Sequence, residues 1–275
     1  MQIHAPAKLN LCLYLGPRRE DGLHELCSLF EPLALGDPIV VEEAERDEVV
    51  CRGVPGDNLA ARALAALREH GWEGPPLRIA IEKRIPVAAG LGGGSADAAA
   101  VLRLAAGQVA DLEQIAARLG ADVPSQLAPS LALVQGAGER VERLPDPAAH
   151  SVVLLADGGG LSTAEVFAAC DRLGLGRGGE ELAELADRLR TVAGAGASPL
   201  SFPELLVNDL EPAARSLRPA IGGALDDLRA AGAAHVLLTG SGPTACGLFE
   251  SLVAARDAAA ALDRDDAIVC EAGRA

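Results

Sequence analysis

Four of the five residues at positions 90–94 are glycine, and this cluster stands between two patterned segments. Alternating apolar residues at 77–82 predict a strand before it, and the alanine-rich residues 96–106 predict a helix after it. Glycines let backbone amides approach an anion closely, and the start of a helix adds unpaired N–H groups and the positive end of its dipole. This order predicts a phosphate-binding site, although it also occurs in plain connections that bind no ligand.

Two well-known phosphate-binding patterns do not fit this loop. The P-loop pattern GxxxxGK[ST] is absent because no lysine follows the glycines. The dinucleotide pattern GxGxxG fails at its last position, where Ser95 replaces the third glycine. The loop by itself therefore leaves both interpretations open.

Charge and aromatic content exclude a nucleic-acid-binding protein. The net charge is −15, and the chain has one Trp, one Tyr and four Phe, whereas nucleic acids require basic surface and, for single strands, stacking aromatic side chains. The five histidines show no HxxxH or HExxH spacing, so we expect no metal ligands among them. The six cysteines form no CxxC pair and lie mostly in apolar stretches, which favours buried free thiols.

The distribution of apolar residues argues against a membrane protein. No apolar run approaches the ~18 residues that a membrane span needs, and the first residues lack the basic and apolar regions of a signal peptide. We therefore expect a cytoplasmic protein with no membrane partner. With 275 residues, 49% hydrophobic and 23% charged, the chain can form one large or two medium domains.

Strands and helices alternate irregularly along the chain, which favours an α+β fold over a doubly wound sheet. Residues 145–150 are the best linker candidate and divide the chain into expected domains at 1–148 and 149–275. We expect strands at 7–15, 26–35, 39–43, 77–82, 131–135, 140–144, 152–156, 236–239, 244–249 and 268–270. We expect helices at 59–70, 96–106, 112–119, 163–173, 180–192, 212–217, 219–231 and 252–262.

Several local patterns bear on these elements. Leucines at 9, 11, 13 and 15 predict a half-buried strand, and Gly36-Asp37-Pro38 predicts a turn between two strands. Asp57-Asn58 offers an N-cap for the helix that ends at Gly71. Asp122, two residues before Pro124, stands where an N-cap residue precedes a helix.

Three segments resemble motifs of the GHMP kinases, in the same order along the chain. PVAAGLGGGSADAAA at 86–100 resembles their phosphate-binding motif, APAKLNL at 5–11 their first motif, and LTGSGPT at 238–244 their third. Within this superfamily, DGLH at 21–24, LGADVP at 119–124 and NDLE at 208–211 are similar to a member whose acceptor alcohol carries cytidine diphosphate. Together the motifs span nearly the whole chain.

The resemblance implies a two-domain α+β architecture, with an N-terminal domain like ribosomal protein S5 and a ferredoxin-like C-terminal domain. It implies transfer of a phosphoryl group from ATP, with Mg²⁺ accompanying the nucleotide, to a small-molecule alcohol that carries cytidine diphosphate. We expect a monomer or a homodimer.

The resemblance also implies two catalytic residues. Asp122 matches the base that accepts the proton of the acceptor hydroxyl, and Lys8 matches the cation that makes this hydroxyl more acidic. The residues alone suggest simpler roles: Asp122 would cap a helix, and Lys8 would face solvent from an edge strand. The chain has 22 arginines but only two lysines, Lys8 and Lys83, which hints that a compact ammonium is needed at these two positions.

The same motifs imply two binding sites. The ATP site would comprise Asn58, Lys83, Pro86, Val87, Ala88, Ala89, Gly90, Leu91, Gly92, Gly93, Gly94, Ser95 and Ala96. The site for the cytidine-bearing substrate would comprise Asn10, Leu23, His24, Thr163, Phe167, Gly240, Ser241 and Gly242. The simpler roles are a helix cap for Asn58, a solvated side chain for Lys83, core packing for Phe167 and a tight connection for 240–242.

Two departures from the family pattern leave alternatives open. Leu23 stands where the family commonly has tyrosine, so the cytosine would lose a stacking partner worth about 1–3 kcal/mol. Ala96 replaces a second serine that the backbone cradle does not need. The alternatives are a GHMP kinase for another small alcohol, of the homoserine or mevalonate type, a non-catalytic nucleotide-binding protein, and an acidic α+β interaction domain.

Overall fold

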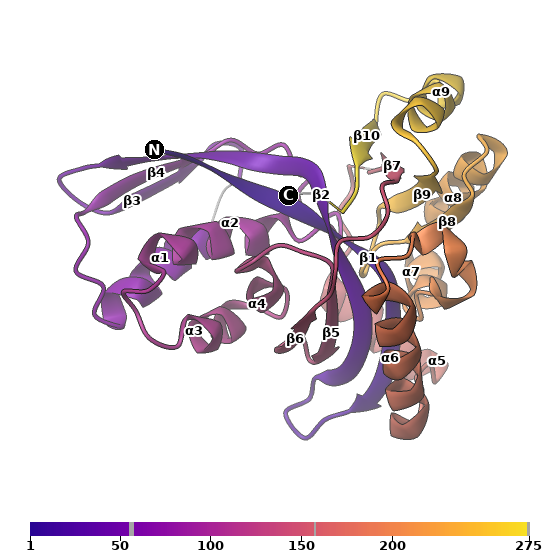
Figure 1. Cartoon of the computed structure of the whole chain (residues 1–275), viewed down its shortest axis with the longest axis horizontal. Helices are drawn as coiled ribbons and strands as arrows, with labels where there is room; N and C mark the ends of the chain where they lie inside the picture. The colour runs from indigo at the N-terminus through magenta and orange to yellow at the C-terminus, as the bar shows by residue number, and fades with distance from the viewer. Residues whose placement is uncertain (55–57, 157, 274–275) are drawn as a thin grey trace.

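The computed structural model describes residues 1–54, 58–156 and 158–273 (Figure 1). It contains two β-sheets with helices packed against each, which confirms the α+β class. No helix in this part of the chain is long and apolar enough to cross a membrane.

The first sheet is built around two long N-terminal strands, β1 (Gln2–Arg18) and β2 (His24–Glu43). Its remaining strands are β3 (Glu48–Cys51), β4 (Leu77–Ile81), β5 (Ala132–Gly136) and β6 (Arg140–Arg143). The order is β3-β4-β2-β5-β6, with β1 paired to β2, and only the β3–β4 pair is parallel among the described strands. In Figure 1, β1 and β2 run together through the middle of the molecule.

Four helices gather on the side of this sheet that holds the glycine loop. They are α1 (Leu59–Glu69), α2 (Gly93–Leu102), α3 (Leu112–Leu119) and α4 (Val123–Gln126), and a 3₁₀ turn, η1 (Arg103–Ala105), follows α2. Their apolar faces bury a cluster that includes Leu64, Leu67 and Trp72 with Ile79 of β4. All residues of α2 from 96 to 102 are buried there, because alanines allow the helix to approach its neighbours closely.

The second sheet is antiparallel, in the order β10-β7-β9-β8. Its strands are β7 (Ser151–Leu155), β8 (His235–Leu238), β9 (Ala245–Phe249) and β10 (Ala267–Glu271). One apolar cluster joins it to helices α5 (Thr163–Leu173), α7 (Glu211–Leu217), α8 (Ala220–Ala230) and α9 (Leu252–Leu262).

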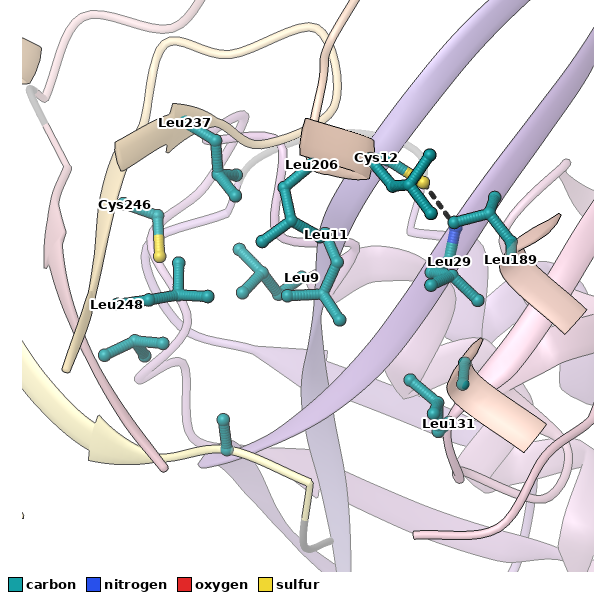
Figure 2. Packing of buried hydrophobic residues seen from close by; sticks show 14 of the residues in the cluster. Leu9, Leu11, Cys12, Leu29, Leu131, Leu189, Leu206, Leu237, Cys246 and Leu248 are labelled. Carbon is teal, nitrogen blue, oxygen red and sulfur yellow. Dashed lines mark hydrogen bonds between the residues drawn. The ribbon is translucent and has the colours of Figure 1, made fainter. Parts of the chain in front are cut away.

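The two sheets share a buried core. Figure 2 shows Leu9 and Leu11 of β1 between side chains of β8 and β9 on one side and Leu29 on the other. The helix α6 (Gly179–Gly194) also enters this core through Leu189, although it lies beyond residue 148. Two short 3₁₀ turns, η2 (Pro199–Ser201) and η3 (Pro203–Leu205), follow it. Among the described residues, one apolar core therefore joins the first half of the chain to the second.

A buried ionisable pair fixes the connection between the first sheet and the second. Residues 144–150 form neither helix nor strand, and His150 Nε2 lies 3.2 Å from Glu31 Oε2 with both side chains fully buried. Burial raises the pKa of Glu31, although the hydrogen bond and charge of His150 act in the opposite direction. Burial lowers the pKa of His150, but its contacts with Glu31 outweigh this effect, so the pKa of His150 is raised. The boundary after residue 148 stays a prediction.

Strong local patterns predicted most elements well. The helices α3, α5 and α9 have the predicted bounds, and Asn58 caps α1 by accepting a hydrogen bond of 2.8 Å from Ala60 N. Asp57, the other residue of that predicted cap, lies outside the described residues. The strand β3 was not predicted.

The predicted turn at residues 36–38 is wrong. β2 continues through it, and Gly36, Asp37 and Pro38 pair in regular register with residues 6, 5 and 4 of β1. Asp37 points its carboxylate instead at the main-chain N–H groups of Arg84 and Ile85, at 2.6 and 2.9 Å.

The predicted strand at residues 7–15 lies within β1, but the expectation that it is half-buried is wrong. All residues from 5 to 16 are buried, and a register shift between Asn10 and Cys12 marks a β-bulge. Because of the bulge, Leu9 and Leu11 belong to the core between the sheets, whereas Leu13 and Leu15 belong to the cluster beneath α5 and α7. Regular alternation could not reveal this change of face.

Candidate active site

One cavity of about 540 Å³ lies where the glycine loop, β1, the start of α4 and the first turns of α5 meet. Most residues that the sequence singled out line it: Lys8, Asn10, Asn58, Lys83, Pro86, Val87, Ala88, Ala89, Gly90, Leu91, Gly92, Gly93, Gly94, Ser95, Asp122, Thr163, Phe167, Gly240 and Ser241. Leu23, His24, Ala96 and Gly242 do not line this cavity.

The glycine loop leads from β4 into α2 and packs on both β1 and the β8–β9 connection. Gly92 has φ +68°, and a Cβ there would lie 2.9 Å from Lys8 Cγ. Gly90 has φ +78°, and a Cβ there would overlap the main-chain oxygen of Thr239. The positive φ and the lack of room for a Cβ therefore both require glycine at positions 90 and 92. Because α2 begins at Gly93, the unpaired amides of its first turn lie beside the loop, next to Ser95, where an anion is favoured.

Lys8 is a buried cation in the wall of this cavity. Its side chain is 6% exposed, so the interpretation of a solvent-facing lysine is wrong. Nζ donates hydrogen bonds to Asn10 Oδ1 and, at 3.2 Å, to the Gly90 carbonyl oxygen, and it lies 4.8 Å from the centre of the Phe30 ring. Asp122 Oδ2 lies 3.6 Å from Nζ. A buried ammonium is thus paired with an accessible carboxylate.

Asp122 occupies the N-cap position of α4 without capping it. Its side chain makes no cap hydrogen bond, and its carboxylate turns toward Lys8 with 30% of the side chain exposed. Only its main-chain oxygen serves the helix start, by accepting a hydrogen bond of 2.8 Å from Ser125 Oγ. The helix-cap interpretation is therefore wrong, and the carboxylate is available to a ligand.

Lys83 is held between two buried carboxylates. Nζ donates to Asp37 Oδ2 and, at 2.8 Å, to Asp97 Oδ2, so the solvated interpretation is wrong. Burial raises the pKa of Asp97 to about 7, against the opposite effect of Lys83. The second oxygen of Asp97, Oδ1, is buried and has no hydrogen-bond partner. The sequence analysis did not single out Asp97, although a lone acid in an alanine-rich helix is a signal for a buried ionic contact.

The wall near α5 carries the predicted aromatic residue. Phe167 lines the cavity and its ring centre lies 5.5 Å from that of His24, with an interplanar angle of 37°. His24 Nε2 donates to Asp171 Oδ1 at 2.9 Å, because a carboxylate oxygen can only accept. Leu23 is 54% exposed. Sequence reasoning also missed Phe30, whose ring faces Lys8.

The connection between β8 and β9 ties the glycine loop to β1. Thr239 Oγ1 accepts a hydrogen bond of 3.0 Å from Asn10 N, and Ser241 shares one of 2.8 Å with the hydroxyl of Thr163. Asn208 Nδ2 donates to the carbonyl oxygens of Leu238 and Gly240, at 2.7 and 2.8 Å. This connection is therefore both a strand-to-strand turn and part of the cavity wall.

Two family models match the chain. Residues 58–129 match the GHMP kinases N terminal domain, and residues 197–267 match the GHMP kinases C terminal domain. The fold and the glycine-loop cavity are thus those of a GHMP kinase, a class of enzyme that uses ATP.

Similar proteins identify the family within this class to which the chain belongs. The chain is 41% identical to the 4-diphosphocytidyl-2-C-methyl-D-erythritol kinase of Mesorhizobium japonicum, over 94% of this chain and 89% of that protein. It is also 41% identical to the kinase of the same name from Thermobifida fusca, over 94% and 90%. The chain belongs to the 4-diphosphocytidyl-2-C-methyl-D-erythritol kinase family and is a phosphotransferase with an alcohol group as acceptor.

Solved structures agree with this assignment. A crystal structure of 4-(cytidine 5'-diphospho)-2C-methyl-D-erythritol kinase matches all of this chain and all of its own, with a TM-score of 0.81 and 36% identity. The homoserine kinase of Cytophaga hutchinsonii matches 100% of this chain and 94% of its own, with a TM-score of 0.70 but 18% identity, and so shares the fold alone.

Proposed function

We propose that this protein transfers the γ-phosphoryl group of ATP to the 2-hydroxyl of 4-diphosphocytidyl-2-C-methyl-D-erythritol, a step of the non-mevalonate route to isoprenoid precursors. The observation that carries the proposal is the pair Lys8–Asp122, at 3.6 Å, in one cavity with the glycine loop. Its support in sequence is the 41% identity to kinases named for this alcohol.

The proposed place of the triphosphate is the glycine loop, 86–96. The main-chain amides of Gly93 and Gly94, in the first turn of α2, and the hydroxyl of Ser95 supply donors there. We propose that Mg²⁺ arrives with the nucleotide, and the Ser95 hydroxyl, which lines the cavity, offers an oxygen atom of the kind that this cation binds. Bound in that way, Mg²⁺ neutralises charge on the phosphoryl oxygens.

The proposed place of the adenosine is the end of the cavity lined by Asn58, Lys83 and Leu59. The two carboxylates beside Lys83 offset its charge, so we propose that Lys83 positions the nucleotide by hydrogen bonding rather than by net charge. Asn58 is fixed by its cap of α1 and can present its amide nitrogen to the ligand.

In the proposed reaction, Asp122 accepts the proton of the 2-hydroxyl. The hydroxyl oxygen forms a bond to the γ-phosphorus, the bond from that phosphorus to the β,γ-bridging oxygen breaks, and ADP leaves with the electron pair. Lys8 stabilises the negative charge that develops on the attacking oxygen, and its burial strengthens this interaction because little water screens it.

The proposed place of the cytidine is the wall formed by Phe167 and His24, with Thr163 and Ser241 toward the phosphates. Asn10 and the glycines 240 and 242 complete the proposed substrate site. Leu23, largely exposed, stands where the family commonly has tyrosine, so one face of the base would lack an aromatic partner.

The test is ADP release by the purified protein with Mg-ATP, measured with and without 4-diphosphocytidyl-2-C-methyl-D-erythritol. Homoserine and mevalonate serve as alternative acceptors under the same conditions. We expect release that depends on the cytidine-bearing alcohol, and a phosphorylated product in equal amount. Stimulation by homoserine or mevalonate alone would reassign the acceptor, and ATP binding without release under any condition would favour a non-catalytic protein.

A further inference from the structure

Hydrogen-bond donors and acceptors around Asn10 fix the orientation of its amide. The hydroxyl of Ser28, a fully buried residue of β2, has one proton and donates it to the main-chain oxygen of Cys12, which can only accept. Toward Asn10 the same hydroxyl oxygen must therefore accept, and Asn10 Nδ2 donates to it at 2.9 Å. The other end of the amide, Oδ1, then faces Lys8 Nζ.

We propose that Ser28 is a positioning residue for phosphoryl transfer: through the amide of Asn10 it holds Lys8 in line with Asp122. This proposal rests on the proposed function, in which Lys8 and Asp122 act on the acceptor hydroxyl. If the amide turned over, its NH₂ group would meet the ammonium of Lys8, and two donors would face each other. Lys8 would then leave its place 3.6 Å from Asp122 Oδ2.

The β-bulge in β1 creates the place for this arrangement. The register shift falls between Asn10 and Cys12, and Leu29 N–H contacts Cys12 Sγ at 3.4 Å. The main-chain oxygen of Cys12 accepts the Ser28 hydroxyl. The main-chain N–H of Asn10 donates to Thr239 Oγ1, which fixes the backbone of this residue independently of Ser28.

The experiment compares Ser28→Ala, Lys8→Ala and the double variant in the full chain, by ADP release at saturating Mg-ATP and cytidine-bearing alcohol. A misplaced Lys8 is expected to lower the kcat of Ser28→Ala by about 10- to 100-fold, the scale of a 1 Å misplacement in an active site. The KM for ATP should stay nearly unchanged. Since Ser28 acts through Lys8, Ser28→Ala should lower kcat no further when Lys8 is already alanine.

A second pair of variants keeps the test valid if Ser28→Ala folds poorly. Ser28→Thr and Ser28→Val have nearly the same shape and differ in the hydroxyl, so a purely structural role would affect both alike. We expect Ser28→Thr to retain most of the kcat and Ser28→Val to lose it. An unchanged kcat in Ser28→Ala, an equal loss in the Lys8→Ala background, or equal kcat values for Thr and Val would each overturn the proposal.

Failure of the proposed function gives a different result. If the unaltered protein releases no ADP with the cytidine-bearing alcohol, the assigned reaction fails before any variant is compared. If the unaltered protein is active and Lys8→Ala keeps its full kcat, the role of Lys8 is refuted, and the role of Ser28 with it.

Discussion

Asp122 stands at the start of a helix, yet its carboxylate serves the cavity rather than the helix. For Asp122→Asn we expect kcat to fall by about 10²- to 10⁴-fold, because the amide cannot accept the hydroxyl proton. ATP binding should persist, since Asp122 pairs with Lys8 and not with the glycine loop. ADP release measures the first effect. For the second, saturating nucleotide at ~100 times its Kd should still raise the free energy of unfolding by about 2.7 kcal/mol.

An aspartate at the start of another helix provides the control for that variant. Asp111 is exposed, precedes α3 and makes no cap hydrogen bond with its side chain, so Asp111→Asn should leave kcat unchanged. Near-normal turnover in Asp122→Asn would remove Asp122 from the role of base.

The raised pKa of Asp97 predicts that the stability of the protein depends on pH. Its pKa is about 7 in the folded chain and 3.8 without the fold's influence, so between these values the folded protein binds a proton that the unfolded chain does not. Its contribution to stability therefore decreases as pH rises from about 4 to 7. Asp97→Asn lacks this contribution. Between about pH 5 and about pH 8, its free energy of unfolding should therefore fall by less than that of the unaltered protein.

Urea unfolding of both proteins at the two pH values measures this difference. The Lys83–Asp37 contact should persist in Asp97→Asn, since it does not depend on Asp97. Parallel pH profiles in the two proteins would contradict the prediction.

Residue identity predicted which side chains line the cavity better than how they are oriented in it. Lys8, Asp122 and the glycine loop could be grouped from the sequence because each stands in a motif of fixed spacing. The alternatives of helix cap and solvated lysine could be decided only by the fold, since the same residues in the same order serve either role. Phe30 and Asp97 were missed because strand and helix periodicity did not show which of their faces meets the cavity.

At the scale of elements, the glycine loop is held by two kinds of constraint. Gly90 has a left-handed φ of +78° and no space for a Cβ beside the main-chain oxygen of Thr239. Gly90→Ala should therefore destabilise the protein by about 1–3 kcal/mol. Gly94 lies in the first turn of α2 without a positive φ, and a Cβ there would lie 3.7 Å from Leu59 Cδ1, so Gly94→Ala should keep or increase stability.

Urea unfolding free energies of the two glycine variants check this contrast. Because both residues line the cavity, the comparison concerns stability and not activity. Equal effects of the two substitutions would mean that the contact with Thr239 does not strain the loop.

Elements with strong local periodicity could be predicted, whereas those that depend on distant partners could not. α5 and α9 have amphipathic patterns and caps within their own sequences. β3 is a short strand that exists by pairing with β4 across about 25 intervening residues. The continuous course of β2 depends likewise on contacts of Asp37 with residues 84 and 85, far along the chain.

At the scale of the whole molecule, the shared core predicts cooperative unfolding. Leu9 and Leu11 of β1 pack against β8 and β9, and Leu189 of α6 packs into the same cluster. Trp72, the single tryptophan, is buried among the helices of the first sheet, so its fluorescence reports that part alone. We expect its urea transition to coincide with the far-UV circular dichroism transition of the whole chain.

Separate midpoints for the two signals would mean that the parts before and after residue 148 unfold independently. That result would also support the predicted boundary as a boundary of stability. The motifs could predict a two-part chain, but not that α6, from the second part, completes the core of the first.

The two lysines described above also set the amine chemistry of the protein. Their side chains are 6% and 12% exposed, and both line the cavity. An acylating reagent would therefore find no lysine side chain on the outer surface, only two shielded ones in the cavity. Acylation of either lysine would then report whether the cavity is open or occupied.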